Sequence, residues 1–339
     1  MQAVSGKMLR PQTIYFEPAA LEYELGQMLR KKFADVSWEP IESHNSIPFM
    51  QSKPNSEFMR MKQSIVVGVR KTHVFVPNHK TSDFLVPYTS SGCSAACLYC
   101  YLVCNYNKCS YLRLFVNREA MLSKIIRTAE KSEKELVFEI GSNSDLILEN
   151  TITGNLVWTV EQFATCKKGA LTLPTKFDMV EPILPLNHRG RIIIRMSVNP
   201  QEIIRRIEIG TSPLEGRIAA FNSLVDAGYQ TGLLIAPVIL TEGWRDAYPL
   251  LLEQLADGLS ARAKKGLRIE IIFMTYSYVH RMINRDAFPA SPDLYDPSAM
   301  TVRGRGKYCY RQGERQEASE LLRAGIANYL PQAEIQYIV

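Results

Sequence analysis

From about residue 110 onward the chain alternates short apolar strands with helical segments, and this alternation restricts the possible folds more than any other feature. The strand candidates are rich in Val, Ile, Leu and Phe, and they span residues 135–141, 170–176, 191–199, 232–240 and 267–277. The helix candidates share an apolar stripe, and they span Asn155–Cys166, Met179–Leu184, Pro213–Ala227, Trp244–Gly258 and Glu317–Tyr329. Such a pattern predicts an α/β fold with a parallel sheet, either doubly wound or a complete or partial barrel.

Polar residues cluster where these strands end. They are Ser142 to Asp145, Thr175 and Lys176, Ser197 to Asn199, and Ala236 with Pro237. In parallel α/β folds the functional site lies at the carboxyl ends of the strands. The sequence therefore predicts a site at this edge of the sheet.

The first ninety residues differ from the rest. A short strand candidate at residues 12–18 precedes a helical stretch at 19–35, and residues 64–77 read as extended because they are rich in Val. We expect a small N-terminal α/β segment over residues 1–88. The barrel and a C-terminal substrate-binding segment are expected over residues 89–339.

Composition points to a cytoplasmic protein. Of the 339 residues, 46% are hydrophobic and 22% are charged, which is ordinary for a globular chain. No apolar run reaches the roughly 18 residues of a membrane span, and the start lacks the apolar stretch of a secretory signal. The seven cysteines are then expected to be reduced and to bind metal or do chemistry. The net charge of +6 is compatible with a nucleic-acid partner.

Four of the seven cysteines lie in the stretch SGCSAACLYCYLVC, residues 91–104. Cys93, Cys97 and Cys100 have the spacing C-x3-C-x2-C, which can bring three thiolates to one metal centre. Thiolates favour zinc, copper(I) or iron–sulfur clusters. Zinc stays an alternative, because Cys104 and Cys109 could supply further ligands. A [4Fe–4S] cluster usually has four cysteines, so three would leave one iron open.

The cysteine loop followed by βα units resembles the radical SAM superfamily. The resemblance implies a [4Fe–4S] cluster held by Cys93, Cys97 and Cys100, with S-adenosylmethionine on the open iron. It also implies a partial (β/α)6 barrel of the TIM type. The aromatic Tyr99, one position before the last cysteine, agrees with the superfamily's preference. When the cluster is reduced, such enzymes form a 5′-deoxyadenosyl radical.

A narrower resemblance covers nearly the whole chain. Segments similar to the spore photoproduct lyase family are IYFEPAALEYELG, SIVVGVRKT, GCSAACLYCYL, SYLRLFVN, PTKFDMVEPIL, GTSP, DAGYQTG, IAPVILTEGW and GKYCY. That family repairs a thymine dimer, 5-thyminyl-5,6-dihydrothymine, in DNA. Membership would imply DNA carrying a thymine photoproduct as substrate and an electron donor such as flavodoxin or ferredoxin.

The resemblance also implies roles for individual residues. Tyr99 would lie by the adenine of the cofactor, and Ala236 would line the nucleoside side through its backbone. The amino and carboxylate groups of the cofactor would contact Ser144, Lys176 and Ser197. Simpler interpretations of these residues are a solvated charge for Lys176 and helix N-caps for the two serines.

The chain departs from the family where a hydrogen atom is returned to the product radical. The family's donor cysteine lies in a segment resembling FEASCTSD, and this chain reads FEIGSNSD, with Ser142 at the cysteine position. A serine O–H bond is too strong to give a hydrogen atom to a carbon radical. We therefore expect another thiol to act, with Cys104, Cys109 and Cys309 as candidates, while Cys166 is expected to be an ordinary buried thiol.

Two further catalytic and substrate-binding features are implied. The tyrosine that relays the hole in the family is present as Tyr101, for which packing in the core is the alternative. An Arg-Tyr pair that engages the lesion in the family is replaced by Val302 and Arg303. The surrounding basic and aromatic residues, a pattern suited to phosphates and bases, are Arg303, Arg305, Lys307, Tyr308 and Arg311.

Three functions follow from these observations. The leading hypothesis is a radical SAM lyase that repairs a thymine photoproduct. A second is an enzyme of the same family acting on another nucleic-acid lesion or a modified base. A third belongs to another class, a non-catalytic nucleic-acid-binding protein whose cysteines hold a structural metal site.

Overall fold

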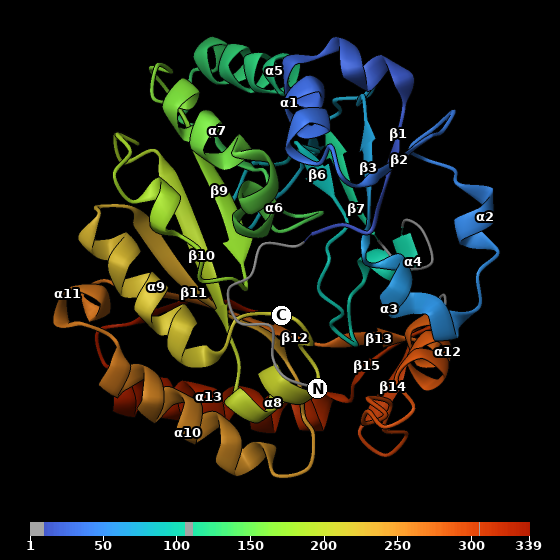
Figure 1. Cartoon of the computed structure of the whole chain (residues 1–339). Helices are drawn as coiled ribbons and strands as arrows, with labels where there is room; N and C mark the ends of the chain where they lie inside the picture. The colour runs from blue at the N-terminus through green and yellow to red at the C-terminus, as the bar shows by residue number, and fades with distance from the viewer. Residues whose placement is uncertain (1–9, 106–110, 305) are drawn as a thin grey trace.

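The largest element is an eight-stranded sheet that curls into a partial barrel (Figure 1). The computed structural model describes residues 10–105, 111–304 and 306–339, with the side chains of residues 104 and 105 left out. In spatial order the strands are β16 (Glu334–Ile338), β12 (Arg268–Phe273), β11 (Gln230–Val238), β10 (Ile192–Val198), β9 (Ala170–Thr175), β8 (Val137–Glu139), β5 (Phe84–Leu85) and β4 (Val76–Pro77). All neighbours pair in parallel except β4 and β5. The expected α/β partial barrel is confirmed.

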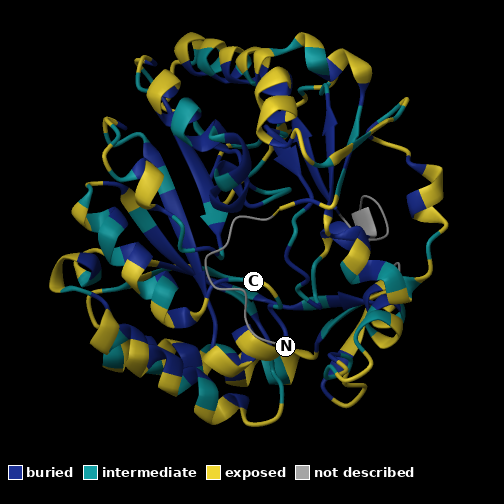
Figure 2. Cartoon of the chain, in the orientation of Figure 1, coloured by how far each residue is buried: buried dark blue, intermediate teal, exposed yellow. Residues whose placement is uncertain are grey.

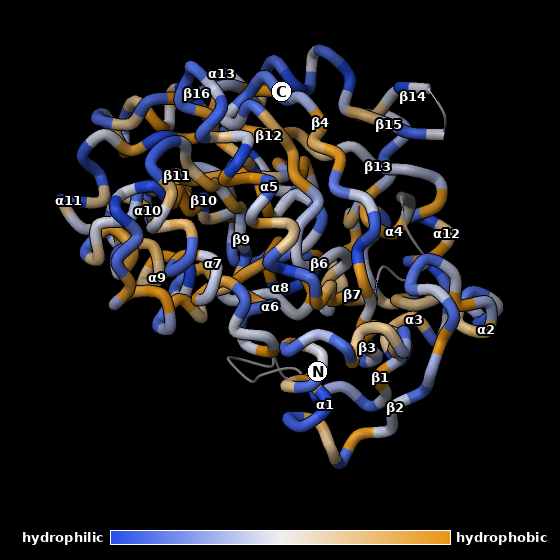
Figure 3. Tube along the Cα trace, turned by 90° about the horizontal axis from the view of Figure 1, so that it is seen from above, coloured by the Kyte–Doolittle hydropathy of each residue, from blue (hydrophilic) through white to orange (hydrophobic). Residues whose placement is uncertain are grey.

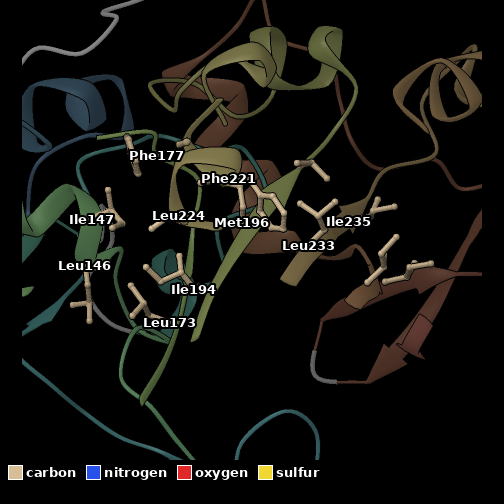
Figure 4. Close-up of a cluster of buried hydrophobic side chains, with 14 of the residues drawn as sticks. Leu146, Ile147, Leu173, Phe177, Ile194, Met196, Phe221, Leu224, Leu233 and Ile235 are labelled. Atoms are coloured by element: carbon tan, nitrogen blue, oxygen red, sulfur yellow. The ribbon is translucent and has the colours of Figure 1, made fainter. Parts of the chain in front are cut away.

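Helices cover the outer face of this sheet. They include α7 (Asn155–Phe163), α8 (Gln201–Arg206), α9 (Leu214–Asp226), α10 (Trp244–Gly258), α11 (Ala261–Lys264) and α13 (Gln312–Tyr329). The central strands β8 to β12 are largely buried, whereas the helices expose their outward sides (Figure 2). Figure 4 shows Ile194 and Leu233 of the strands among Phe221 and Leu224 of α9, all of them buried. This apolar layer is the core that holds the strand ends in place.

One expected helix is wrong. Residues 179–184 contain only a single 3-10 turn, Glu181–Ile183. Pro185 has no N–H to donate to the preceding turn, so the helix does not continue past Leu184. The helix expected at Trp244–Gly258 has the bounds of α10.

A second sheet is built mainly from the N-terminal residues. Its order is β2 (Ser37–Pro40), β1 (Thr13–Phe16), β3 (Ser64–Gly68), β7 (Leu112–Phe115) and β6 (Ser90–Ser91), and the short helices around it are η1 (Pro18–Glu22), α1 (Glu24–Lys32), α2 (Pro48–Gln51), η2 (Asn55–Glu57) and α3 (Phe58–Met61). Helix α5 (Arg118–Lys131) follows β7. The extended stretch 64–77 is divided, because β3 joins this sheet and β4 joins the barrel. Since β6 and β7 lie beyond residue 88, the boundary at that residue stays a prediction.

A third, antiparallel sheet stands at the margin of the molecule (Figure 3). Its strands are β13 (Thr275–Ser277), β15 (Lys307–Tyr310) and β14 (Met300–Gly304), in that order. Helix α12 (Tyr278–Ala287) follows directly on β13. Strands β14 and β15 form a hairpin, which carries Arg303 and Lys307, two of the basic residues singled out in the sequence.

A buried ion cluster joins three strands inside the barrel. Arg195 of β10 contacts Glu139 of β8 at 2.6 Å and Glu270 of β12 at 3.0 Å, and all three are nearly inaccessible. A buried charge is tolerated where it is paired and hydrogen-bonded. The cluster therefore fixes the relative positions of β8, β10 and β12. Within the ranges that the structure describes, no helix is both long and apolar enough to cross a membrane.

Candidate functional site

A cavity of about 470 Å³ opens at the carboxyl ends of the barrel strands. The lining residues that the sequence singled out are Cys93, Cys97, Tyr99, Cys100, Tyr101, Ser142, Ser144, Lys176, Ser197 and Ala236. A pocket of this size and position is where parallel α/β proteins bind ligands. Residues from five separate segments of the chain thus meet in one place.

The cysteine loop is held by backbone hydrogen bonds to two other segments. The N–H groups of Ala96 and Leu98 donate to the carbonyls of Ile209 and Ile207, at 2.8 and 3.0 Å. At the start of the loop, Gly92 N–H donates to the carbonyl of Asn143 at 2.8 Å. The loop therefore lies between the end of β8 and the segment that follows α8.

Three side chains from outside the barrel strands donate to carbonyls of the same loop. Lys62 Nζ contacts the carbonyl of Cys93 at 2.8 Å, and Asn284 Nδ2 contacts that of Leu98 at 2.7 Å. His280 Nε2 lies 2.8 Å from the carbonyl of Cys100. Because a carbonyl only accepts, His280 carries its proton on Nε2, and Nδ1 accepts from the N–H of Ser277. No local pattern in the sequence predicted these contacts.

The three thiols are half-buried next to one another. Burial raises the pKa of Cys93 to about 12, with Lys62 opposing the rise, and burial raises the pKa of Cys97 as well. Bound metal competes with protons for thiolates, so loading this site releases protons.

The donor set suits a [4Fe–4S] cluster. Within the described part of the chain, no three His, Cys, Asp or Glu side chains are grouped closely enough to hold one metal ion. A four-iron cluster makes a different demand, because each thiolate binds its own iron. Three cysteines around one cavity, next to residues suited to a polar cofactor, meet that demand.

Lys176 is not a solvated surface charge. Its side chain is 20% exposed, and Nζ donates to Ser197 Oγ at 2.5 Å and to the carbonyl of Ala236 at 2.7 Å. Ser197 lies within β10, so it does not cap a helix. The ends of β9, β10 and β11 are therefore joined by one ammonium group.

Glu208 is a site residue that the sequence analysis missed. It is fully buried and accepts from Tyr99 Oη at 2.5 Å and from Arg217 at 2.7 Å, with Lys176 Nζ 3.3 Å away. Burial alone would raise its pKa, but the two cations lower the pKa of Glu208 to about 2. The carboxylate is thus charged at neutral pH and holds Tyr99 and Lys176 toward the same cavity.

Ser144 is linked through Ser90 to a second buried carboxyl group, that of Glu149. Ser90 Oγ lies 2.7 Å from Ser144 Oγ and 2.6 Å from Glu149, which is itself 1% exposed. The N-cap of α6 (Leu146–Thr153) is Asp145 rather than Ser144, because Asp145 accepts from the N–H groups of Ile147 and Leu148. The hydroxyl of Ser144 is thus fixed at the edge of the cavity without serving as a cap.

Tyr101 is 49% exposed, so it is not a core residue, and its hydroxyl donates to the backbone carbonyl of Ser142. This contact brings Tyr101, the expected relay, to Ser142, the residue at the expected donor position. Tyr101 begins the turn that leads into α4 (Leu102–Asn105).

Other expected residues lie outside the cavity lining. Cys166 is 3% exposed in the apolar core, as expected. Cys309 lies in β15 opposite Thr275, which does line the cavity. Of the hairpin residues, Arg303 and Lys307 are exposed, and the Tyr308 ring packs 4.6 Å from that of Tyr295. The side chain of Cys104, and Cys109 and Arg305 altogether, lie outside the described residues.

Comparison with known proteins decides the family. The family model described as spore photoproduct lyase matches residues 9–339. The chain belongs to the spore photoproduct lyase family. Its sequence is 31% identical over 335 residues to spore photoproduct lyase of Bacillus subtilis, covering 96% of this chain and 98% of the relative. The corresponding protein of a Geobacillus strain is 30% identical with the same coverage.

Solved structures of the family agree with this fold. Spore photoproduct lyase in complex with the dinucleoside spore photoproduct is similar with a TM-score of 0.90 and 29% identity, covering 98% of this chain and all of the other. A double mutant with bound AdoMet (S-adenosylmethionine) and the dinucleoside gives the same values. The resemblance identified in the sequence is thereby confirmed.

Proposed function

We propose that the chain is a radical SAM lyase that reverses the spore photoproduct, 5-thyminyl-5,6-dihydrothymine, to two thymines. The observation that carries the proposal is the cavity in which the three spaced cysteines meet Lys176, Ser144 and Ser197. Two family members with this activity in their names match the chain over 96% of its length. Family membership favours an enzyme over a non-catalytic binding protein.

The chain's own residues suit both cofactors. Cys93, Cys97 and Cys100 would hold the [4Fe–4S] cluster. Lys176 would pair with the carboxylate of S-adenosylmethionine, since a charge-assisted bond is about twice as strong as a neutral one. When bound and reduced, these cofactors supply a 5′-deoxyadenosyl radical, the reagent that removes hydrogen from C6 of the lesion.

Other polar groups would complete the cofactor site. Ser144 and Ser197 offer hydroxyls to the amino and carboxylate ends. Tyr99, fixed by its bond to Glu208, would lie beside the adenine, and Ala236 would line the nucleoside through its backbone. Because Glu208 keeps its charge, it orients these groups without taking up a proton.

The return of hydrogen needs a donor other than Ser142. Among the described residues, the thiols that line the cavity are those of the three cluster cysteines. We propose a thiol of Cys104, Cys109 or Cys309 as the donor. Tyr101 would act as the relay, since its hydroxyl is held at the carbonyl of Ser142.

The partner would be DNA, reached through the hairpin. Arg303 and Lys307 are exposed there, and Arg305 lies between them in the sequence. Cations of this kind contact phosphates, and Tyr308 could stack on a base. A dinucleotide lesion should leave the duplex at lower cost than an intact step. The electron would come from a flavodoxin- or ferredoxin-type protein.

The test is anaerobic product analysis. The reconstituted protein is given S-adenosylmethionine, dithionite and a dinucleotide that carries the photoproduct, and every product is quantified. We expect two thymines, and none from a Cys97→Ala variant. Formation of 5′-deoxyadenosine without thymine would contradict the proposed substrate while leaving the radical chemistry intact.

The alternative substrate is another nucleic-acid lesion or a modified base. Two departures favour it: Ser142 at the donor position, and Val302 with Arg303 where the family has Arg-Tyr. The same assay, run with a panel of damaged dinucleotides, separates the two. Faster turnover of another lesion than of the spore photoproduct would establish it.

A further inference from the structure

Lys62 places a buried positive charge directly against the cysteine loop. It lies in the turn between α3 and β3, and only 2% of the residue is exposed. Its Nζ donates to the carbonyl of Cys93 at 2.8 Å and lies 5.4 Å from the centre of the Phe58 ring. The side chain thus reaches the loop from the N-terminal sheet.

The Lys62 ammonium is removed from water in the folded protein. Removing a charged group from water is unfavourable unless hydrogen bonds or opposite charge compensate. A neutral donor could also make the hydrogen bond to the Cys93 carbonyl. What the cation adds is a positive potential in a poorly screened interior, next to a cysteine that lines the cavity.

We propose that Lys62 raises the reduction potential of the cluster that Cys93, Cys97 and Cys100 would hold, and so makes it reducible by biological donors. This rests on the proposed function. Reduction adds one electron to the cluster, from a low-potential flavodoxin- or ferredoxin-type donor, with no bond formed or broken. A nearby buried positive charge stabilises the added negative charge, and net charge around the cluster is a known determinant of its potential.

Three variants separate charge from structure. Lys62→Gln keeps a hydrogen-bond donor but removes the charge, and Lys62→Arg keeps the charge. Lys131→Gln, at the exposed end of α5, is the matched control for loss of a distant lysine. Each reconstituted protein is titrated with dithionite at controlled potential, without S-adenosylmethionine or lesion, and the reduced cluster is measured by electron paramagnetic resonance.

We expect the ratio of reduced to oxidised cluster at a fixed potential to fall about tenfold in Lys62→Gln. For one electron this corresponds to a midpoint about 59 mV more negative. Lys62→Arg and Lys131→Gln should stay within about twofold of the parent. Iron and sulfide content and circular dichroism are measured on the same samples to show that the proteins are equally loaded and folded.

Two results would overturn the inference. One is an unchanged midpoint in a fully loaded Lys62→Gln protein. The other is a Lys62→Gln protein that holds no cluster while Lys62→Arg does, because the charge would then serve the structure of the loop. Since no lesion is used, a shifted midpoint in a protein that repairs nothing contradicts only the proposed function. An unchanged midpoint in a protein that makes thymine contradicts only the role of Lys62.

Discussion

At the scale of single residues, Lys176 is the cation that we propose to bind the cofactor's carboxylate. Its ammonium already bridges Ser197 and the carbonyl of Ala236 at the cavity wall. We predict that Lys176→Met weakens equilibrium binding of S-adenosylmethionine about 10- to 100-fold, because a hydrogen bond to a charged group contributes about 1.5–3 kcal/mol. Calorimetric titration of the reconstituted protein measures this. Lys167→Met, exposed in the loop before β9, should bind as the parent does. Equal affinity in both variants would contradict the assignment.

Ser142 can be tested because it lies on the cavity but cannot donate a hydrogen atom. We predict that Ser142→Ala leaves the rate of thymine formation within about twofold, since Tyr101 bonds to the backbone of residue 142 and not to its side chain. Ser142→Cys should raise the fraction of radical events that end in thymine. Product analysis by chromatography and mass spectrometry follows both. A large loss in the alanine variant would show that the serine hydroxyl has a role in the reaction.

The sequence predicted some site residues and missed others for a physical reason. Lys176 follows β9 and Ser197 lies at the carboxyl end of β10, and the strand-end rule of parallel sheets was enough to bring them together. Glu208, Lys62 and His280 belong to no such pattern. His280 lies 180 positions from Cys100, and only the tertiary fold makes them neighbours.

At the scale of elements, Glu17 links the ends of β1 and β3 to the loop after β2. Its carboxylate accepts from the N–H groups of His44 and Val69, at 2.9 and 2.8 Å, and from the His44 ring. Burial would raise its pKa, but these bonds lower the pKa of Glu17 below the ordinary 4.5. The stabilisation is therefore complete above about pH 4.5 and is lost as the pH falls through the folded-state pKa.

This pH dependence of the stabilisation gives a prediction for the Glu17→Gln variant. At pH 7 the free energy of unfolding should fall by about 1–3 kcal/mol, because buried donors lose a charged acceptor. The difference from the parent should shrink as the pH is lowered below about 4.5. Urea unfolding of the cluster-free proteins over a pH series measures both. Glu22→Gln, which is exposed, is the control, and a gap that is the same at every pH would show that the charge is not responsible.

Helix α12 connects the hairpin to the cysteine loop, a link that no sequence pattern indicated. It begins where β13 ends, and its His280 and Asn284 contact the carbonyls of Cys100 and Leu98. The sequence located the long apolar strands well, because burial on both faces gives continuous hydrophobic runs. It missed α12 and the strands of the hairpin, which are short and rich in charged or exposed residues.

At the scale of the whole molecule, three sheets meet around one loop. The barrel supplies Lys176 and Ser197, the N-terminal sheet brings Lys62, and the hairpin is coupled through α12. The barrel sheet ends at β16 on one side and at β5 and β4 on the other. The sequence did not identify β4 and β5 as strands of this sheet, since they have two residues each. Strands as short as β4 and β5 are extended because they pair with neighbouring strands, and local propensity does not predict them.

From the net charge of +6 and the exposed hairpin we expect binding to a lesion-bearing duplex to depend on salt. Cations that neutralise phosphates release bound counterions, so the logarithm of affinity falls linearly with that of salt concentration, with a slope of about −0.9 per phosphate contact. We predict that replacing both Arg303 and Lys307 by alanine makes this slope less steep by about two. Fluorescence anisotropy between about 50 and 200 mM salt gives the slope.

A double variant of Arg127 and Lys131 on α5 removes the same charge from another exposed surface and should keep the parental slope. If both double variants shift the slope equally, long-range charge rather than the hairpin governs binding, and the hairpin is not the phosphate contact.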